Sequence, residues 1–232
     1  MITLLTMTGE RPEAFALCER WMARQTYSGP VRWIIVDDGQ KAQPIKFKRK
    51  NWKVEVVRPE PSWTHGANTQ ARNIIAGLDR IGAEERLVII EDDDWYSASW
   101  LSTVSAALDA HELVGESHAK YYNVAQRKAR EHENEQHASL CSTALRGRAL
   151  DVLRGVCRPG IQFIDVMLWQ AFGPAGLFRG NDVVGMKGLP GRKGIGVGHA
   201  KQFSGALDAE AKILRSWIGA DVEAYFPSEK SS

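Results

Sequence analysis

The chain has 232 residues, of which 44% are hydrophobic and 25% are charged, a composition typical of one globular domain with a packed core. Its net charge is only +2, which excludes a global basic signal for nucleic acid. Three widely separated cysteines exclude a disulfide framework and a zinc finger. The N-terminus matches neither a signal peptide nor a membrane span, so we expect a cytoplasmic protein with no membrane partner.

Strands and helices alternate through the first half of the chain. The segment ITLLTMT reads as a buried strand, and the residues after it carry apolar side chains at helical spacing. In chain order we expect a strand at 2–8, a helix at 11–25, strands at 31–39 and 54–58, a helix at 65–81, a strand at 86–94 and a helix at 97–110. This rhythm predicts an α/β fold with a mainly parallel central sheet and helices on both faces.

The second half of the chain is less regular. We expect one or two strands in 111–128, an exposed loop or helix in the polar segment 130–138, a strand and then a helix in 139–155, a helix in 162–172 and a closing helix in 207–218. The glycine-rich segment 180–199 is expected to be a mobile loop. No linker interrupts the chain, so we treat 1–232 as one domain.

Acidic residues follow two of the predicted strands directly. One strand ends at Asp37 and Asp38, and LVIIEDDD places Glu91 to Asp94 directly after four apolar residues. If both strands are parallel, both groups lie along the edge of the sheet where ligands of such folds bind. A run of acids is often only a solvated loop. Here a Mg²⁺ or Mn²⁺ ion would offset the repulsion between carboxylates and assist the departure of a diphosphate, or phosphoryl chemistry.

Four segments in this order resemble one family, namely TMTGERPEAF (6–15), VDDG (36–39), GANTQARNIIAGL (66–78) and IIEDDDW (89–95). They are similar to motifs of the family 2 nucleotide-sugar glycosyltransferases, which have the Rossmann-like GT-A fold. The resemblance implies that 1–110 is the nucleotide-sugar-binding half and that 111–232 is a smaller acceptor-side half. The implied donor is a nucleotide sugar, for which we favour a UDP-sugar.

The resemblance also implies roles for individual residues of the first half. The residues that would hold the donor are Thr6, Arg11 and Asp38 at the nucleoside, Arg72 at the diphosphate or sugar, and Glu91 at the ribose or a metal-bound water. Asp93 would bind the metal, Mn²⁺ or Mg²⁺. Position 91 carries Glu where Asp is more usual, which keeps the charge.

The second half matches the family more loosely. FIDVMLW (163–169) resembles the helix start that supplies the catalytic base, so Asp165 would take the acceptor proton in an inverting transfer. The alternative is an ordinary helix carboxylate. His199 would complete the metal shell, and Arg192 and Lys193 would hold the diphosphate. The alternative is an exposed loop with an incidental His.

Two basic clusters bear on the acceptor. KFKRKNWK (46–53) has five basic residues, and Arg127, Lys128 and Arg130 form a second group. Each could be a solvated edge. Together they would suit DNA that bears a hydroxymethylated base, which the enzyme would flip out of the duplex. The alternatives are a saccharide or small-molecule acceptor, a sugar-phosphate nucleotidyltransferase, and a nucleic-acid-binding module without enzymatic activity.

Overall fold

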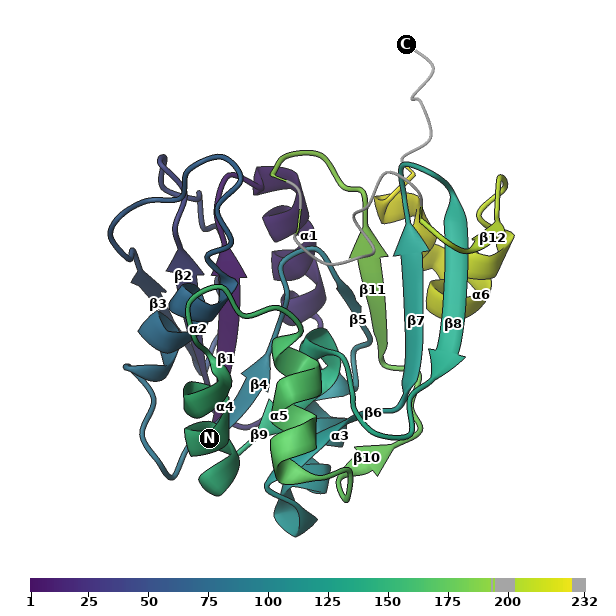
Figure 1. The fold of residues 1–232 in the computed structure, drawn as a ribbon. Coiled ribbons are helices and arrows are strands. Elements are labelled where there is room, and N and C mark those ends of the chain that lie inside the picture. The colour runs from purple at the N-terminus through teal and green to yellow at the C-terminus, as the bar shows by residue number, and fades with distance from the viewer. Residues whose placement is uncertain (193, 195–202, 227–232) are drawn as a thin grey trace.

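The computed structural model describes residues 1–192, 194 and 203–226 (Figure 1). In the first half the elements are β1 (Ile2–Thr8), α1 (Pro12–Ala23), β2 (Val31–Asp37), β3 (Trp52–Val57), α2 (Gln70–Leu78), β4 (Arg86–Ile89), β5 (Trp95–Tyr96) and α3 (Trp100–Ala110). In the second half they are β6 (Leu113–Glu116), β7 (His118–Asn123), β8 (Lys128–Glu133), η1 (Leu140–Ser142), β9 (Thr143–Leu145), α4 (Arg148–Val156), α5 (Ile164–Phe172), β10 (Leu177–Phe178), β11 (Val183–Lys187), β12 (Ala206–Leu207), α6 (Lys212–Ile218) and η3 (Gly219–Ala224).

The main sheet has seven strands in the order β10-β6-β9-β4-β1-β2-β3. The strands β4, β1, β2 and β3 run parallel, and β9 runs antiparallel to both of its neighbours. The strands β1, β2 and β4 carry unbroken apolar runs because both faces of this part of the sheet are covered. Leu4 and Ile35 pack into one core cluster, and their chain neighbours Leu5 and Ile34 pack into the other.

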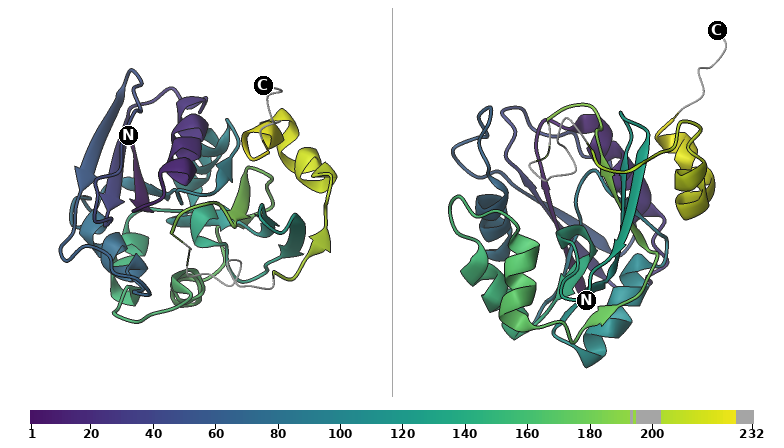
Figure 2. Two further views of the ribbon diagram at one scale, coloured as in Figure 1. Left: turned by 90° about the horizontal axis from the view of Figure 1, so that it is seen from above. Right: turned by 45° about the vertical axis from the view of Figure 1, so that its right-hand side comes forward.

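Helices cover both faces of the main sheet. The helices α1 and α3 contribute to the cluster that contains Leu4, and α2, α4 and α5 contribute to the cluster that contains Leu5. Figure 2 shows α1 and the C-terminal helices on one side of the molecule and the green helices α4 and α5 on the other. The predicted fold class, a mainly parallel α/β sheet with helices on both faces, is therefore confirmed.

A second sheet of five strands, in the order β12-β8-β7-β11-β5, stands beside the first (Figure 1). The strand β5 follows the acidic segment directly and pairs antiparallel with β11. The acidic segment therefore links the two sheets. The helices α6 and η3 pack on the same core cluster as α1, where Trp21 Nε1 donates a hydrogen bond of 3.0 Å to Tyr225 Oη.

The strand predicted at 86–94 ends at Ile89, β5 was not predicted, and the closing helix begins at Lys212 rather than at 207. Three other segments also differ from the sequence prediction. The polar segment 130–138, expected to be a loop or helix, begins inside β8, which pairs antiparallel with β7. The segment 180–199, expected to be a loop, contains the buried strand β11. The helix α2 begins at Gln70 rather than at 65. In the first two cases strand pairing outweighs the polar or glycine-rich composition, because backbone hydrogen bonds do not depend on the side chains.

Among the described residues, no helix has the length and apolar character needed to cross a membrane.

Candidate active site

The acidic residues lie where the parallel strands of the main sheet end. The register pairs Leu5 of β1 with Ile89 of β4, and Thr8 of β1 with Asp37 of β2. The segment Glu91–Asp94, which we call the acidic loop, follows β4, and Asp38 follows β2. Both groups therefore lie at the carboxyl edge of the sheet, as the strand order implies.

Arg11 and Thr8 hold the middle of the acidic loop. Asp92 accepts hydrogen bonds of 2.7 Å from Thr8 Oγ1 and from Arg11 Nη1. Arg11 Nη2 donates a 2.7 Å bond to Asp93 Oδ2. Burial raises the pKa of Asp92 to about 6, although the charge of Arg11 opposes this shift. Burial alone would lower the pKa of Arg11, but the carboxylates of Asp92 and Asp93 outweigh that effect and raise it.

Strand β11 of the second sheet holds the end of the loop. Asp94 Oδ1 accepts a 2.7 Å bond from the Met186 N–H and a 3.2 Å bond from Lys187 Nζ. The same ammonium lies 4.0 Å from Asp93 Oδ2. Asp94 is fully buried, and this burial raises its pKa although Lys187 opposes the shift.

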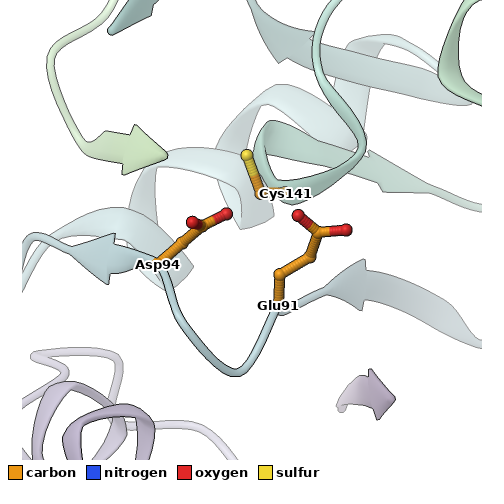
Figure 3. Close-up of side chains that lie close together, drawn as sticks. All are labelled: Glu91, Asp94 and Cys141. Carbon is orange, nitrogen blue, oxygen red and sulfur yellow. The ribbon is translucent and has the colours of Figure 1, made fainter. Parts of the chain in front are cut away.

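Glu91, Asp94 and Cys141 form a compact cluster, with one ligand atom from each within 4.8 Å of the others (Figure 3). Asp94 Oδ2 is buried without a hydrogen-bond partner among the described residues. The backbone N–H of Glu91 donates to Tyr96 Oη at 2.9 Å, and Gln70 Nε2 donates to Glu91 Oε1 at 3.1 Å. Glu91 keeps part of its surface open, yet burial and then the charge of Asp94 raise its pKa.

The described residues fit a Mg²⁺ or Mn²⁺ ion poorly. Such ions prefer several oxygen ligands. The Asp93 carboxylate is already in contact with Arg11 and Lys187. In the neighbouring cluster, burial and the charge of Asp94 raise the pKa of the Cys141 thiol, and sulfur is in any case a poor ligand for Mg²⁺ and Mn²⁺, which prefer oxygen. Only the carboxylates of Glu91 and Asp94 remain as oxygen ligands, and His199 lies outside the described residues.

Asp38 is the centre of a second network. Its Oδ2 accepts a 2.8 Å bond from Asn73 Nδ2, a bond from Thr69 Oγ1 and a 3.3 Å bond from Arg72 Nη2. Its Oδ1 accepts a 2.5 Å bond from Arg192 Nη1, and Asp38 is almost fully buried. Three predicted donor-binding residues, Asp38, Arg72 and Arg192, are thus in direct contact.

Trp63 is the aromatic neighbour of this network. The Arg192 guanidinium lies 4.3 Å from the centre of the Trp63 ring, and its Nη2 donates a 2.8 Å bond to Thr69 Oγ1. Trp63 Nε1 donates to Ala67 O at 3.0 Å, which fixes the ring at the start of the α2 region. A flat ring and a guanidinium beside a carboxylate are groups that can bind a nucleobase and a phosphate.

Asp165 lies in the first turn of α5, beside the cluster that contains Cys141. Its Oδ1 accepts a 2.9 Å bond from the Val166 N–H. Burial raises its pKa, and backbone N–H groups of Val166 and Leu140 oppose this shift. Because Leu140 immediately precedes Cys141 in η1, the structure brings Asp165 to the same region as Glu91 and Asp94.

Other predicted residues lie elsewhere. Thr6 is fully buried within β1, where its hydroxyl accepts a 2.9 Å bond from Trp33 Nε1, so it does not reach the carboxyl edge. Arg11 was predicted beside Asp38 at the nucleoside, but its guanidinium donates to Asp92 and Asp93 of the acidic loop. Lys193 lies outside the described residues, as does most of the predicted mobile loop beyond Arg192.

The basic run 46–53 does not border the acidic loop. Asn51 O accepts a bond from Val31 N at the beginning of β2, and Arg49 Nη2 donates to Gln25 O just past the end of α1. The end of the run therefore lies at the amino edge of the sheet, about 20 Å from the carboxyl edge for strands of seven residues. In the second cluster, the Arg127 guanidinium lies over the Phe226 ring, and Lys128 donates to Phe203 O. The structure does not bring the two clusters together.

Sequence reasoning missed Thr8 and Lys187. Thr8 ends the first apolar run, and Lys187 ends the short apolar run VVGM. The acids were predicted because they are polar residues at the end of an apolar strand. Thr8 and Lys187 have the same position in their segments. Lys187 lies in the segment 180–199, which the sequence predicts to be a loop.

No protein-family model and no curated protein sequence matches this chain. The chain does share its fold with a solved structure of TarS 1-349 from S. aureus in complex with UDP-GlcNAc, with a TM-score of 0.54 and 12% identity over 87% of this chain. This chain spans 62% of that one. TarS 1-349 from S. aureus in complex with UDP gives a TM-score of 0.48 at 11% identity, with 80% of this chain and 60% of that chain covered. At this identity the likeness shows the fold.

Proposed function

We propose that this protein is a nucleotide-sugar glycosyltransferase that uses a UDP-sugar donor. One observation supports the proposal: Asp38 and the acidic loop both follow strands at the carboxyl edge of a parallel sheet, and Asp165 lies near Leu140, the residue before Cys141. The fold that presents this edge is shared with a TarS structure that contains UDP-GlcNAc. The four segments of the sequence that resemble family 2 motifs predict the same activity.

In the proposed reaction Asp165 acts as the general base. An acceptor hydroxyl gives its proton to the Asp165 carboxylate, and its oxygen forms a bond to the anomeric carbon of the sugar. The bond between that carbon and the diphosphate oxygen breaks, and UDP leaves with the electron pair. Attack from the opposite face inverts the anomeric centre. Burial raises the pKa of Asp165 toward the range in which a base is effective near neutral pH.

For the donor, we propose that Trp63, Asp38 and Arg192 contact the nucleotide. The Arg192 guanidinium is a planar donor that suits phosphate oxygens, and it already lies between the Trp63 ring and Asp38. Arg72 lies on the other side of Asp38. The Mn²⁺ or Mg²⁺ ion remains a prediction of the sequence, and no step of the proposed reaction depends on it.

For the acceptor, we propose a saccharide or a small ring-bearing molecule ahead of DNA. Phe163 directly precedes α5, is 57% exposed and has a left-handed backbone with φ of 57°. Such a conformation is unfavourable for a bulky residue and is often kept at functional sites. An exposed aromatic ring two positions before Asp165 suits the face of a sugar or another ring. The basic run predicted for DNA ends at the opposite edge of the sheet.

The test is a screen of UDP-sugars for release of UDP, with UDP binding measured separately by calorimetry. We expect one UDP-sugar to be hydrolysed slowly, and UDP release to rise when saccharide acceptors are added. A nucleotidyltransferase would instead convert a sugar 1-phosphate and UTP to pyrophosphate and a UDP-sugar. Formation of pyrophosphate without release of UDP would therefore overturn the proposal.

The DNA acceptor is tested by binding to duplex DNA as salt is raised. Several phosphate contacts would give a steep loss of affinity with the logarithm of salt concentration. Lys48→Ala with Lys50→Ala would flatten that slope if the exposed part of the basic run binds DNA. If the protein transfers sugar to hydroxymethylated DNA faster than to saccharides, DNA is the preferred acceptor and the proposed preference for saccharides is wrong.

A further inference from the structure

Lys187 is the charged residue at the end of an otherwise apolar buried strand. The strand β11 pairs with β7 on one side, where Lys187 lies opposite Asn123, and with β5 on the other. The backbone around Lys187 is held on both sides, since its carbonyl accepts a 2.8 Å bond from Val124 N and the preceding N–H donates to Asp94. The paired strand β11 of the second sheet therefore positions the Lys187 side chain beside the acidic loop.

The ammonium of Lys187 lies beside carboxylates of the acidic loop. It lies 3.2 Å from Asp94 Oδ1 and 4.0 Å from Asp93 Oδ2, and its side chain is 9% exposed. Burial would lower its pKa, but Asp93, Asp94 and Glu91 outweigh burial and raise it. The two distances are those of an ion-pair network between Lys187 and the acidic loop. An isolated buried charge is costly, so this cation and these acids depend on one another.

Together, Arg11 and Lys187 offset the repulsion between the carboxylates of the acidic loop. Arg11 contacts Asp92 and Asp93, and Lys187 lies by Asp93 and Asp94. Both cations lie by the same oxygen of Asp93, Oδ2, with Arg11 Nη2 at 2.7 Å and Lys187 Nζ at 4.0 Å. A divalent ion bound to Asp93 from the side of Asp94 would have to share its place with the ammonium, at a cost in like-charge repulsion.

We propose that Lys187 is a built-in counter-ion of the acidic loop, whose ammonium lies between Asp93 and Asp94, beside the Asp93 carboxylate at which the sequence predicts a divalent cation. Lys187 is a positioning residue: it acts through the carboxylates and keeps the loop in shape without an ion. It also lowers the affinity of the loop for Mg²⁺ and Mn²⁺. The inference concerns the loop alone and does not rest on the proposed transfer reaction.

The test compares Mn²⁺ binding by the whole protein and by Lys187→Met, measured by calorimetry and by the electron paramagnetic resonance signal of free Mn²⁺. We expect the variant to bind Mn²⁺ at least tenfold more tightly than the parent protein. Adding Asp93→Asn to the variant should remove the gain. Lys120→Met is the matched control, because Lys120 is also a nearly buried lysine of the second sheet, but it donates to Asn181 at 2.6 Å. It should bind Mn²⁺ as the parent does.

Equal or weaker Mn²⁺ binding by Lys187→Met would overturn the proposal. If that variant fails to fold, the parent protein provides the second measurement. Its melting temperature should be the same in Mn²⁺ and in EDTA, and a rise in Mn²⁺ that Asp93→Asn abolishes would also overturn the proposal. If the proposed function is right, the affinity of the parent protein for UDP measured in EDTA should agree within twofold with the affinity measured in Mn²⁺. Complete absence of UDP binding would count against the proposed function and leave the Mn²⁺ comparison intact.

Discussion

Arg192 and Asp38 are 154 positions apart in the chain, yet Arg192 Nη1 lies 2.5 Å from Asp38 Oδ1. This ion pair ties the segment after β11 to the segment after β2. It also covers the carboxylate that the sequence predicts at the nucleoside. A nucleotide that reaches Asp38 must therefore displace Arg192, and the freed guanidinium is then available to the phosphates.

Arg192→Ala should lower the affinity for UDP and leave the affinity for uridine unchanged or slightly higher. Hydrogen bonds to charged groups contribute about 1.5–3 kcal/mol, which corresponds to a loss of at least tenfold for UDP. Uridine has no phosphate, and Asp38 keeps Arg72 and Asn73 as donors. Calorimetric titration with both ligands measures the difference. Arg80→Ala, which removes an exposed arginine 3.9 Å from Glu55, should change neither affinity. Equal losses for UDP and uridine would contradict the phosphate role.

Asp165→Asn should abolish transfer and leave UDP binding unchanged, because the base acts on the acceptor and not on the donor. Loss of a general base typically reduces the rate by about 10²–10⁴-fold. The measurement is the initial rate of transfer beside a calorimetric titration with UDP. Asp151→Asn, in the first turn of α4 and exposed, is the matched control and should keep full activity. A transfer rate unchanged by Asp165→Asn would remove this residue from the mechanism.

Asp93→Asn should destabilise the fold. From the sequence alone, removing one of several adjacent acids could raise the melting temperature. In the structure Asp93 accepts a bond from Arg11 and lies by Lys187, so its loss leaves two buried cations with fewer partners. We expect a loss of about 1.5–3 kcal/mol in the free energy of unfolding, measured by urea denaturation without metal. A melting temperature above that of the parent would show that repulsion among the acids dominates.

Glu116→Gln should change how stability depends on pH. Glu116 is buried, and this burial raises its pKa to about 7, against bonds from the N–H groups of Asp182 and Val183 and the charge of Lys120. Between pH 4.5 and about 7 the folded protein holds a proton that the unfolded chain releases. Stability contributed by this group is therefore present at low pH and lost as pH rises.

The size of this effect is on the order of 3 kcal/mol, given 1.36 kcal/mol for each pKa unit. Urea denaturation of the parent and of Glu116→Gln from pH 4.5 to 8 measures it, because the difference between the two proteins should change by this amount over the range. Glu84→Gln, at an exposed position, should show a constant difference from its parent. A constant difference for Glu116→Gln as well would mean that the folded protein keeps Glu116 ionised throughout.

Except for the short strand β5, the order of the first-half elements and the edge at which the acids gather could be predicted from the amino-acid sequence. The strand β1 spans 2–8 as predicted, and the acids follow β2 and β4 as predicted. These features depend on local apolar runs and on the alternation of strands and helices, and one amino-acid sequence shows both patterns. The strand β11 was missed because its pairing with β7 and β5 joins segments far apart in the sequence.

The pairing of cations with acids depends on the tertiary structure. Arg11 reaches Asp92 across 81 positions, and Lys187 reaches Asp94 across 93. No local pattern encodes such pairs, because they form when two sheets pack and bring the ends of separate strands together. The same packing buried Thr6 in the core and placed the end of the basic run 46–53 at the opposite edge of the sheet from the acidic loop. Sequence periodicity indicates which side of an element is buried, whereas the partner of a buried charge depends on the arrangement of the whole fold.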